Sequence, residues 1–268
     1  MNQYNPTIII RIGQNALSFA MADESAPNGF IYEPYAINNS MSMAANLREA
    51  FRQSPLLKRN CERAEVIVGV PTLLVPANEF KAENADTYYR FACDSALHRY
   101  EQGSILYNVL PNFNAVAIFK MNSDLRLVIG DHFTDVRYNH LMQAVWQHFY
   151  AKNFTGTSGK LFAYLHDKRL DVFSFDMGRF RFSNAFEVGN SRDAAYFLLA
   201  TWKQLGFDAQ NDEIHLIFDT ENAPTADVQN DRNTLVETLR RYVKKVHTPE
   251  ASESANSLPF DLKILFEN

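Results

Sequence analysis

The chain has 268 residues, 46% of them hydrophobic and 13% aromatic, so we expect a packed globular protein and exclude a disordered one. Its net charge of −5, from 26 Lys and Arg against 31 Asp and Glu, argues against the concentrated basic face that nucleic-acid binding needs, so we expect no nucleic-acid partner. No apolar run approaches the roughly 20 residues of a membrane-spanning helix, and two scattered cysteines favour a reducing compartment, so we expect a cytoplasmic protein.

The first third of the chain predicts a three-stranded antiparallel meander, a helix and a buried strand. Met43, Leu47 and Phe51 recur at helical spacing behind Ser40 and Ser42, either of which could be the N-cap. A continuous apolar run then indicates a strand that is buried on both faces. The expected strands are residues 8–12, 17–22, 30–35 and 66–70.

The middle of the chain predicts an insertion at about residues 71–121. It should contain a helix over 85–101 and strands at 105–110 and 116–121. Residues 124–132 fit a helix or a strand equally well. A short strand at 136–138 and a helix starting near Leu141 follow, before a Gly/Ser/Thr-rich stretch that is the best domain boundary in the chain.

The last third repeats the plan of the first. Two tight turns separate strands between Leu161 and Phe186, and Ser191 could cap a helix that ends just before Gly206. A strand near residues 213–219, a helix around Leu235 and a short strand follow. Residues 249–257 are polar, and the apolar segment 258–266 should pack back on the body.

A repeat relates the two halves of the chain. Leu17 corresponds to Leu170 and Asp23 to Asp176 at the same separation in sequence. We therefore predict an α/β protein with duplicated βββαβα halves. The first lobe should span residues 1–157, with the insertion, and the second lobe residues 158–268.

This order of elements resembles the actin-like ATPase superfamily, which includes sugar kinases, Hsp70 and actin, with ribonuclease-H-like halves that form two lobes. The whole chain also resembles a small uncharacterised bacterial family of that fold. The segments that carry the resemblance are residues 10–17, 109–116, 161–186 and 258–262. The likeness lies in the order of elements and includes no catalytic signature.

The resemblance implies two phosphate hairpins, each usually reading Asp-x-Gly, whose acidic residue holds hydrated Mg²⁺. Here the first reads Arg11-Ile12-Gly13, which replaces the carboxylate by a cation, although Mg²⁺ requires oxygen ligands. The second has Tyr164 at the carboxylate position and His166 at the glycine position. The vestigial phosphate-loop positions are therefore Arg11, Gly13, Gln14, Asn15, His166 and Asp167.

A third element of the superfamily is a Gly-Gly turn before the adenosine site. The corresponding strand here ends in Ile217-Phe218-Asp219-Thr220-Glu221, without glycine. With all three elements altered, we expect no catalytic residue, no resident metal and no ATP or Mg²⁺ cofactor, because phosphoryl transfer depends on positioning and charge neutralisation.

Packing or solvation explains several other polar residues better than catalysis or ligand binding does. Arg11 could bind an anion. Its presence is explained better by packing of its aliphatic side-chain carbons and pairing of its guanidinium with a carboxylate. His140 and His148 are expected eight positions apart on one helix, which is the wrong spacing for a metal pair. The acidic cluster of Asp208, Asp212 and Glu213 is expected to be solvated, and Cys93 to lie in the core.

The sequence thus favours a non-catalytic actin-like domain that acts as a scaffold or through protein contacts, with a protein partner or self-association. The alternative is a diverged ATPase or small-molecule kinase with rearranged metal ligands. That alternative predicts nucleotide turnover that is lost when a cleft acid such as Asp167 or Asp219 is changed. Ligand binding without catalysis in the cleft between the lobes is a third possibility.

Overall fold

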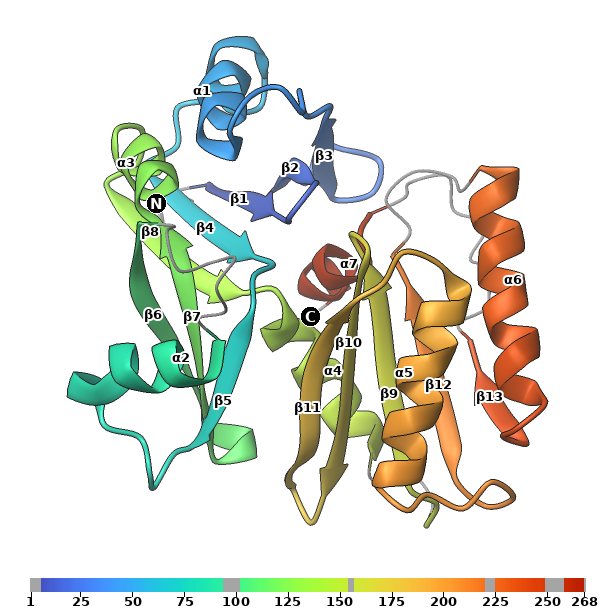
Figure 1. Cartoon of the computed structure of the whole chain (residues 1–268). Coiled ribbons are helices and arrows are strands. Elements are labelled where there is room, and N and C mark those ends of the chain that lie inside the picture. The colour runs from blue at the N-terminus through green and yellow to red at the C-terminus, as the bar shows by residue number, and fades with distance from the viewer. Residues whose placement is uncertain (1–5, 94–101, 154–156, 220–224, 249–257, 268) are drawn as a thin grey trace. The chain divides into compact units, whose positions relative to one another are not determined.

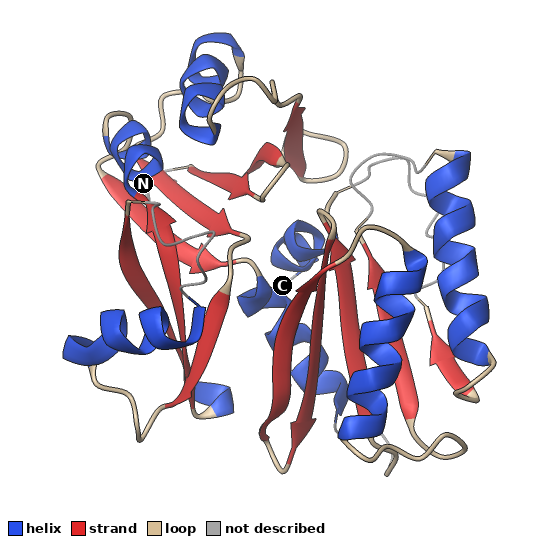
Figure 2. Ribbon diagram, in the orientation of Figure 1, coloured by secondary structure: helices blue, strands red, loops and turns tan. Residues whose placement is uncertain are grey.

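The computed structural model describes residues 6–93, 102–153, 157–219, 225–248 and 258–267 (Figures 1 and 2). Two compact units contain Met1–Gln143 and Ala144–Glu267, which we call unit 1 and unit 2. The division falls inside a helix, whereas the sequence predicted lobes of 1–157 and 158–268. Those lobe boundaries stay a prediction.

The main sheet of unit 1 has the strand order β3-β2-β1-β4-β8. β1, β2 and β3 are antiparallel neighbours, while β4 and β8 run parallel to β1. The β-branched, apolar sequence of the central strands suits burial on both faces. The strands are β1 (Thr7–Ile12), β2 (Leu17–Ala22), β3 (Phe30–Tyr35), β4 (Arg63–Val68) and β8 (Asp135–His140).

Two helices of unit 1, α1 (Met43–Gln53) and α3 (Ser123–Gly130), pack in the same core as alternate residues of this sheet. Ser42 caps α1 by accepting a hydrogen bond from the amide of Ala45 at 3.2 Å, which decides between the two predicted caps. Asn122 caps α3 in the same way through its side-chain oxygen.

The predicted insertion forms a three-stranded sheet in the order β5-β7-β6. Its core joins Val116 and Ile118 of the central strand to Ala85 and Tyr89 of a helix. The first of its strands was missed, because Thr-Leu-Leu-Val-Pro is short and ends in proline. The elements are β5 (Thr72–Pro76), η1 (Ala82–Asn84), α2 (Ala85–Cys93), β6 (Gly103–Leu110), η2 (Pro111–Phe113) and β7 (Ala115–Asn122).

Unit 2 has a sheet in the order β11-β10-β9-β12-β13. Again three strands are antiparallel neighbours, and β12 and β13 continue the sheet in parallel with β9. This strand order and these directions match those of the unit 1 sheet. A common origin of the two halves stays a prediction. The strands are β9 (Lys160–His166), β10 (Arg169–Asp176), β11 (Arg179–Glu187), β12 (Glu213–Phe218) and β13 (Lys245–His247).

Helices cover both faces of the unit 2 sheet (Figure 1). α5 (Ser191–Gln204) and α6 (Ala226–Arg240) share a core with Leu161 and Ala163 of β9. α4 (Met142–Asn153) and α7 (Phe260–Glu267) pack on the opposite face, where Phe149 lies 5.0 Å from the ring of Phe162. Aromatic side chains of β9 and β10 fill this second layer.

Several sequence predictions need correction. Asn190, not Ser191, caps α5, because its side-chain oxygen accepts hydrogen bonds from the amides of Arg192 and Asp193, the second and third residues of the helix. His140 ends β8 and therefore does not share a helix with His148. Cys93 is half-buried at the end of α2 and packs against the edge of the insertion core instead of lying fully inside it. The predicted helix is described only as far as that residue.

Two further segments agree with the prediction, and a third lies outside the described residues. The ambiguous residues 124–132 are helical over most of their length, and segment 258–266 forms the buried helix α7. The polar stretch 249–257 lies outside the described residues. Among the described residues, no helix is both long and apolar enough to cross a membrane.

We expect Leu47→Ala to lower the free energy of unfolding by about 2–5 kcal/mol, because Leu47 is fully buried in α1 and its removal leaves a cavity. Leu127→Ala is the matched control, since Leu127 on α3 is 63% exposed. Its effect should stay within about 0.5 kcal/mol. Denaturant titration of both variants measures the difference, and equal losses would contradict the packing described for α1.

Candidate functional site

The hairpin formed by β1 and β2 contains four of the predicted site residues. Arg11 lies in β1 and is 1% exposed, while Gln14 and Asn15 are exposed at the turn. The amide of Gly13 donates to the carbonyl of Ala16 at 2.8 Å and so closes the turn. Their origin as phosphate-binding positions stays a prediction.

The corresponding turn of unit 2, between β9 and β10, has a different construction. Asp167 and Lys168 occupy its two central positions with φ of 46° and 58°, which is the left-handed pair typical of a tight hairpin. His166 and Arg169 pair across the turn. Non-glycine residues thus make both central positions of this hairpin.

Tyr164, at the predicted carboxylate position, is held inside unit 2. Its hydroxyl donates a hydrogen bond to Oδ1 of Asp261 on α7 at 2.8 Å, and both residues are buried. Its ring stacks on the imidazole of His166, with centroids 4.5 Å apart. The hydrogen bond joins the sheet to the last helix.

Asp171 of β10 lies opposite Tyr164 and accepts hydrogen bonds from two neighbours. Nε2 of His166 donates to its Oδ2 at 2.8 Å, and Arg169 donates from Nε at 2.9 Å and from Nη2 at 3.3 Å. Burial opposes ionisation of Asp171, but the charge of Arg169 and these hydrogen bonds outweigh burial and hold the pKa of Asp171 well below its usual range.

This buried network, which consists of Tyr164, His166, Arg169, Asp171 and Asp261, has consequences for metal chemistry. A hydrated Mg²⁺ needs carboxylate oxygens that are free to face it. Both oxygens of Asp171 accept hydrogen bonds from cationic or polar donors within unit 2, and Tyr164 directs a donor where the superfamily pattern has an acid. Through these residues the hairpin favours internal packing over cation binding.

The end of β12 is the third element that the sequence identified. The amide of Asp219 donates to the carbonyl of Leu165 at 2.9 Å, which continues the sheet by one residue. The guanidinium of Arg232 on α6 lies 5.1 Å from the ring centroid of Phe218. Thr220 and Glu221 of the predicted turn lie outside the described residues.

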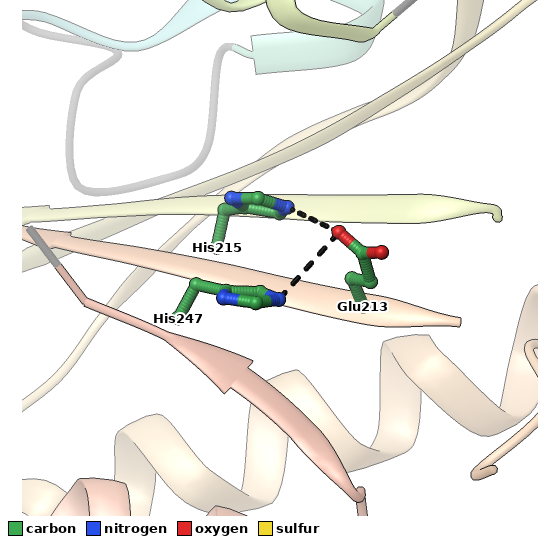
Figure 3. A group of neighbouring side chains, drawn as sticks. All are labelled: Glu213, His215 and His247. Carbon is green, nitrogen blue, oxygen red and sulfur yellow. Dashed lines mark hydrogen bonds and ion pairs between the residues drawn. The ribbon is translucent and has the colours of Figure 1, made fainter. Parts of the chain in front are cut away.

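A cluster of three possible metal ligands lies at the other end of β12 (Figure 3). It consists of Glu213 and His215 of β12 and His247 of β13, whose candidate ligand atoms all lie within 4.8 Å of one another. Nε2 of His215 is 3.0 Å and Nε2 of His247 is 3.6 Å from Oε2 of Glu213. The two imidazole rings stack with centroids 4.7 Å apart.

Strand pairing creates this Glu-His-His cluster. His215 and His247 are directly opposite in the parallel pair of β12 and β13, and Glu213 lies two residues before His215 on the same face. Burial lowers the pKa of His215, although its hydrogen bond to Glu213 acts in the opposite direction. Burial would raise the pKa of Glu213, but hydrogen bonds from Ser158 and His215 reverse this effect and lower it.

The sequence analysis missed this cluster, and its interpretation of the acidic residues needs correction. Glu213 is bonded by its neighbours instead of being solvated, and Oδ1 of Asp212 accepts the amide of Gly159 at 2.7 Å. A Glu-x-His pattern at the start of a strand was the available signal. His247 could not be added to it, because only the pairing of β12 with β13 brings the two segments together.

Comparison with solved structures bears on the fold of the chain. A protein from Bacteroides thetaiotaomicron VPI-5482, described as having an actin-like ATPase fold and unknown function, is 22% identical, with a TM-score of 0.82 over 98% of this chain and 96% of that one. The PilM–PilN type IV pilus biogenesis complex contains a chain that is 10% identical, with a TM-score of 0.51 and 92% of each chain covered.

These likenesses establish the actin-like ATPase fold and, at these identities, nothing about activity. No curated protein matches the sequence significantly. One family model, described as a protein of unknown function (DUF3822), matches residues 1–246, which is most of the chain. The chain therefore belongs to the DUF3822 family and has the actin-like ATPase fold.

Proposed function

We propose that this protein is a non-catalytic actin-like domain that acts as a scaffold by binding another protein or further copies of itself. The buried network of unit 2 carries the proposal. In a nucleotide-hydrolysing relative, the hairpin must leave a carboxylate and open backbone amides for Mg²⁺ and phosphate. Here Tyr164 bonds to Asp261, and Asp171 bonds to His166 and Arg169.

The first hairpin supports the same proposal through its charge. Arg11 occupies the position where the superfamily pattern has an acid, and a guanidinium repels the cation that the acid would hold. Gly13 is retained, so the turn keeps its shape without the metal ligand. The vestigial positions Arg11, Gly13, Gln14, Asn15, His166 and Asp167 are part of this proposal.

The class of partner is inferred from fold analogy. The similar chain in the PilM–PilN complex belongs to a protein–protein assembly of type IV pilus biogenesis. A fold does not specify a function, so the analogy gives the kind of interaction and not the partner. We also propose a cytoplasmic location, which is supported by the low cysteine content of two residues in 268.

We expect Mg-ATP and Mg-ADP to leave the melting temperature unchanged within about 1 °C at millimolar concentration. A ligand that binds only the folded state must raise stability, by about 2.7 kcal/mol at a hundredfold excess over Kd. Thermal-shift and phosphate-release assays across Mg²⁺, Mn²⁺ and Ca²⁺ measure this. Stabilisation by several degrees, or steady turnover that Asp167→Asn or Asp219→Asn abolishes, would contradict the proposal in favour of a diverged ATPase or kinase.

We expect Asp171→Asn to lower the free energy of unfolding by about 3–5 kcal/mol at pH 7, because Arg169 and His166 lose their buried anionic partner. The folded-state pKa of Asp171 is depressed below 3.8, so its contribution is complete above about pH 5 and declines as the pH falls below that value. The difference between wild type and variant should therefore narrow in acid.

Urea titrations from pH 3 to pH 7 measure this difference. Asp135→Asn is the matched control, since the Asp135–Arg63 ion pair is about half exposed on both sides and should contribute no more than about 1 kcal/mol. An Asp171→Asn effect as small as the control, or one that is independent of pH, would show that the buried network does not hold the hairpin as described.

We expect affinity capture from the native host to recover a specific protein partner, or light scattering of the purified chain to show a stable oligomer. Capture should use full-length protein and a bait-free control. A chain that stays monomeric up to high concentration and recovers nothing above the control would contradict the scaffold proposal.

A further inference from the structure

We propose that Glu213, His215 and His247 form a zinc-binding site at the edge of the unit 2 sheet. The site has two imidazole ligands and one carboxylate, which is a donor set that suits Zn²⁺ and disfavours Mg²⁺ and Ca²⁺. It lies at the opposite end of β12 from Asp219, so it is independent of the vestigial phosphate hairpins and of the proposed scaffold function.

Two of the three separations between ligand atoms are close to those of a single tetrahedral ion. The third, between the two imidazole nitrogens, lies within 4.8 Å, and the stacked rings must rotate for both nitrogens to face one ion. Zinc–nitrogen and zinc–oxygen bonds of about 2.0–2.2 Å place neighbouring ligand atoms about 3.3–3.5 Å apart. The two measured separations, 3.0 Å from His215 Nε2 and 3.6 Å from His247 Nε2 to the same oxygen of Glu213, lie on either side of that range. Binding requires side-chain shifts of only a few tenths of an ångström for these two pairs.

The orientation of the Glu213 carboxylate supports coordination through one oxygen. Its Oε1 accepts a hydrogen bond from the hydroxyl of Ser158 at 2.7 Å, and its Oε2 faces both imidazoles (Figure 3). A partner behind a ligating carboxylate fixes its direction and is a common feature of metal sites. Ser158 therefore serves as a positioning residue.

Two lysines oppose a cation here and must be considered. Lys245 Nζ is 3.8 Å from Oε1 of Glu213, and Lys160 pairs with Glu213 on the neighbouring strand. Each ammonium donates to a backbone carbonyl, Lys245 to Asn211 at 2.9 Å and Lys160 to Asn153 at 3.1 Å. The ion pair of Lys245 is with Oε1 of Glu213, whereas both imidazoles face Oε2, the oxygen proposed to bind zinc.

Without zinc, Nε2 of His215 bonds to Oε2 of Glu213 at 3.0 Å, and Nε2 of His247 lies 3.6 Å from the same oxygen. Zinc bound to the two nitrogens would replace these contacts and require both nitrogens to be unprotonated. His247 is 51% exposed on the edge strand β13, which leaves room for a water molecule as the fourth ligand. Zinc would thereby fasten the three-residue strand β13 to β12.

The test is isothermal titration of tag-free, EDTA-treated full-length protein with zinc chloride. We expect one zinc per chain and a melting temperature that rises by about 5 °C at a hundredfold excess over Kd. Cobalt(II) should give the visible absorption bands of a four-coordinate ion. A wild-type chain that binds no zinc, or binds it without the thermal shift, would overturn the proposal.

Two variants separate a zinc site from a simple ion pair. His247→Ala removes an exposed ligand and should weaken zinc binding about a hundredfold while the melting temperature in EDTA changes little. Lys245→Gln removes a competing cation and should tighten zinc binding a few-fold, although it deletes an ion pair. His132→Ala is the histidine control outside the site, since His132 bonds to the carbonyl of Val128. Zinc binding that His247→Ala leaves unchanged would overturn the proposal.

Discussion

The central strand of unit 2 is covered by helices on both faces, and this constraint determines what its polar residues can do. One face of β9 packs with α5 and α6, and the other contacts α4 and α7. A buried polar group is costly unless it is hydrogen-bonded. Tyr164 meets this requirement through Asp261, and His166 meets it on one nitrogen through Asp171.

The same constraint explains why the altered hairpin supports a structural role. A magnesium-binding acid in this layer must be balanced by the ion, whereas Asp171 is balanced by Arg169 and His166 from its own hairpin. The charge that a nucleotide-binding relative leaves for its ligand is here neutralised internally. The charge of Asp171 therefore needs no bound ion to balance it, which agrees with the proposed scaffold role.

The β13 edge of the unit 2 sheet differs from the central strand, because it is partly exposed and its polar residues are not enclosed by helices. β13 is a short parallel edge strand, paired only with β12 among the described strands, and its Val246 packs inward while His247 faces outward. A three-residue strand gains little from its own hydrogen bonds. A metal ion shared between β12 and β13 would add a link at that edge, which gives the Glu-His-His cluster a physical reason beyond charge pairing.

The sequence by itself determined most of the order of elements, with β5 as an exception, because alternation and helical spacing report which face of each segment is apolar. It predicted β1, β2, β3 and α1 closely, and it identified Arg11 and Tyr164 as departures from the superfamily pattern. Only the tertiary structure decided which side chains from distant parts of the sequence contact one another. Asp261 meets Tyr164, and His247 meets Glu213, across long stretches of chain, and no local pattern encodes a contact that strand pairing and helix packing create.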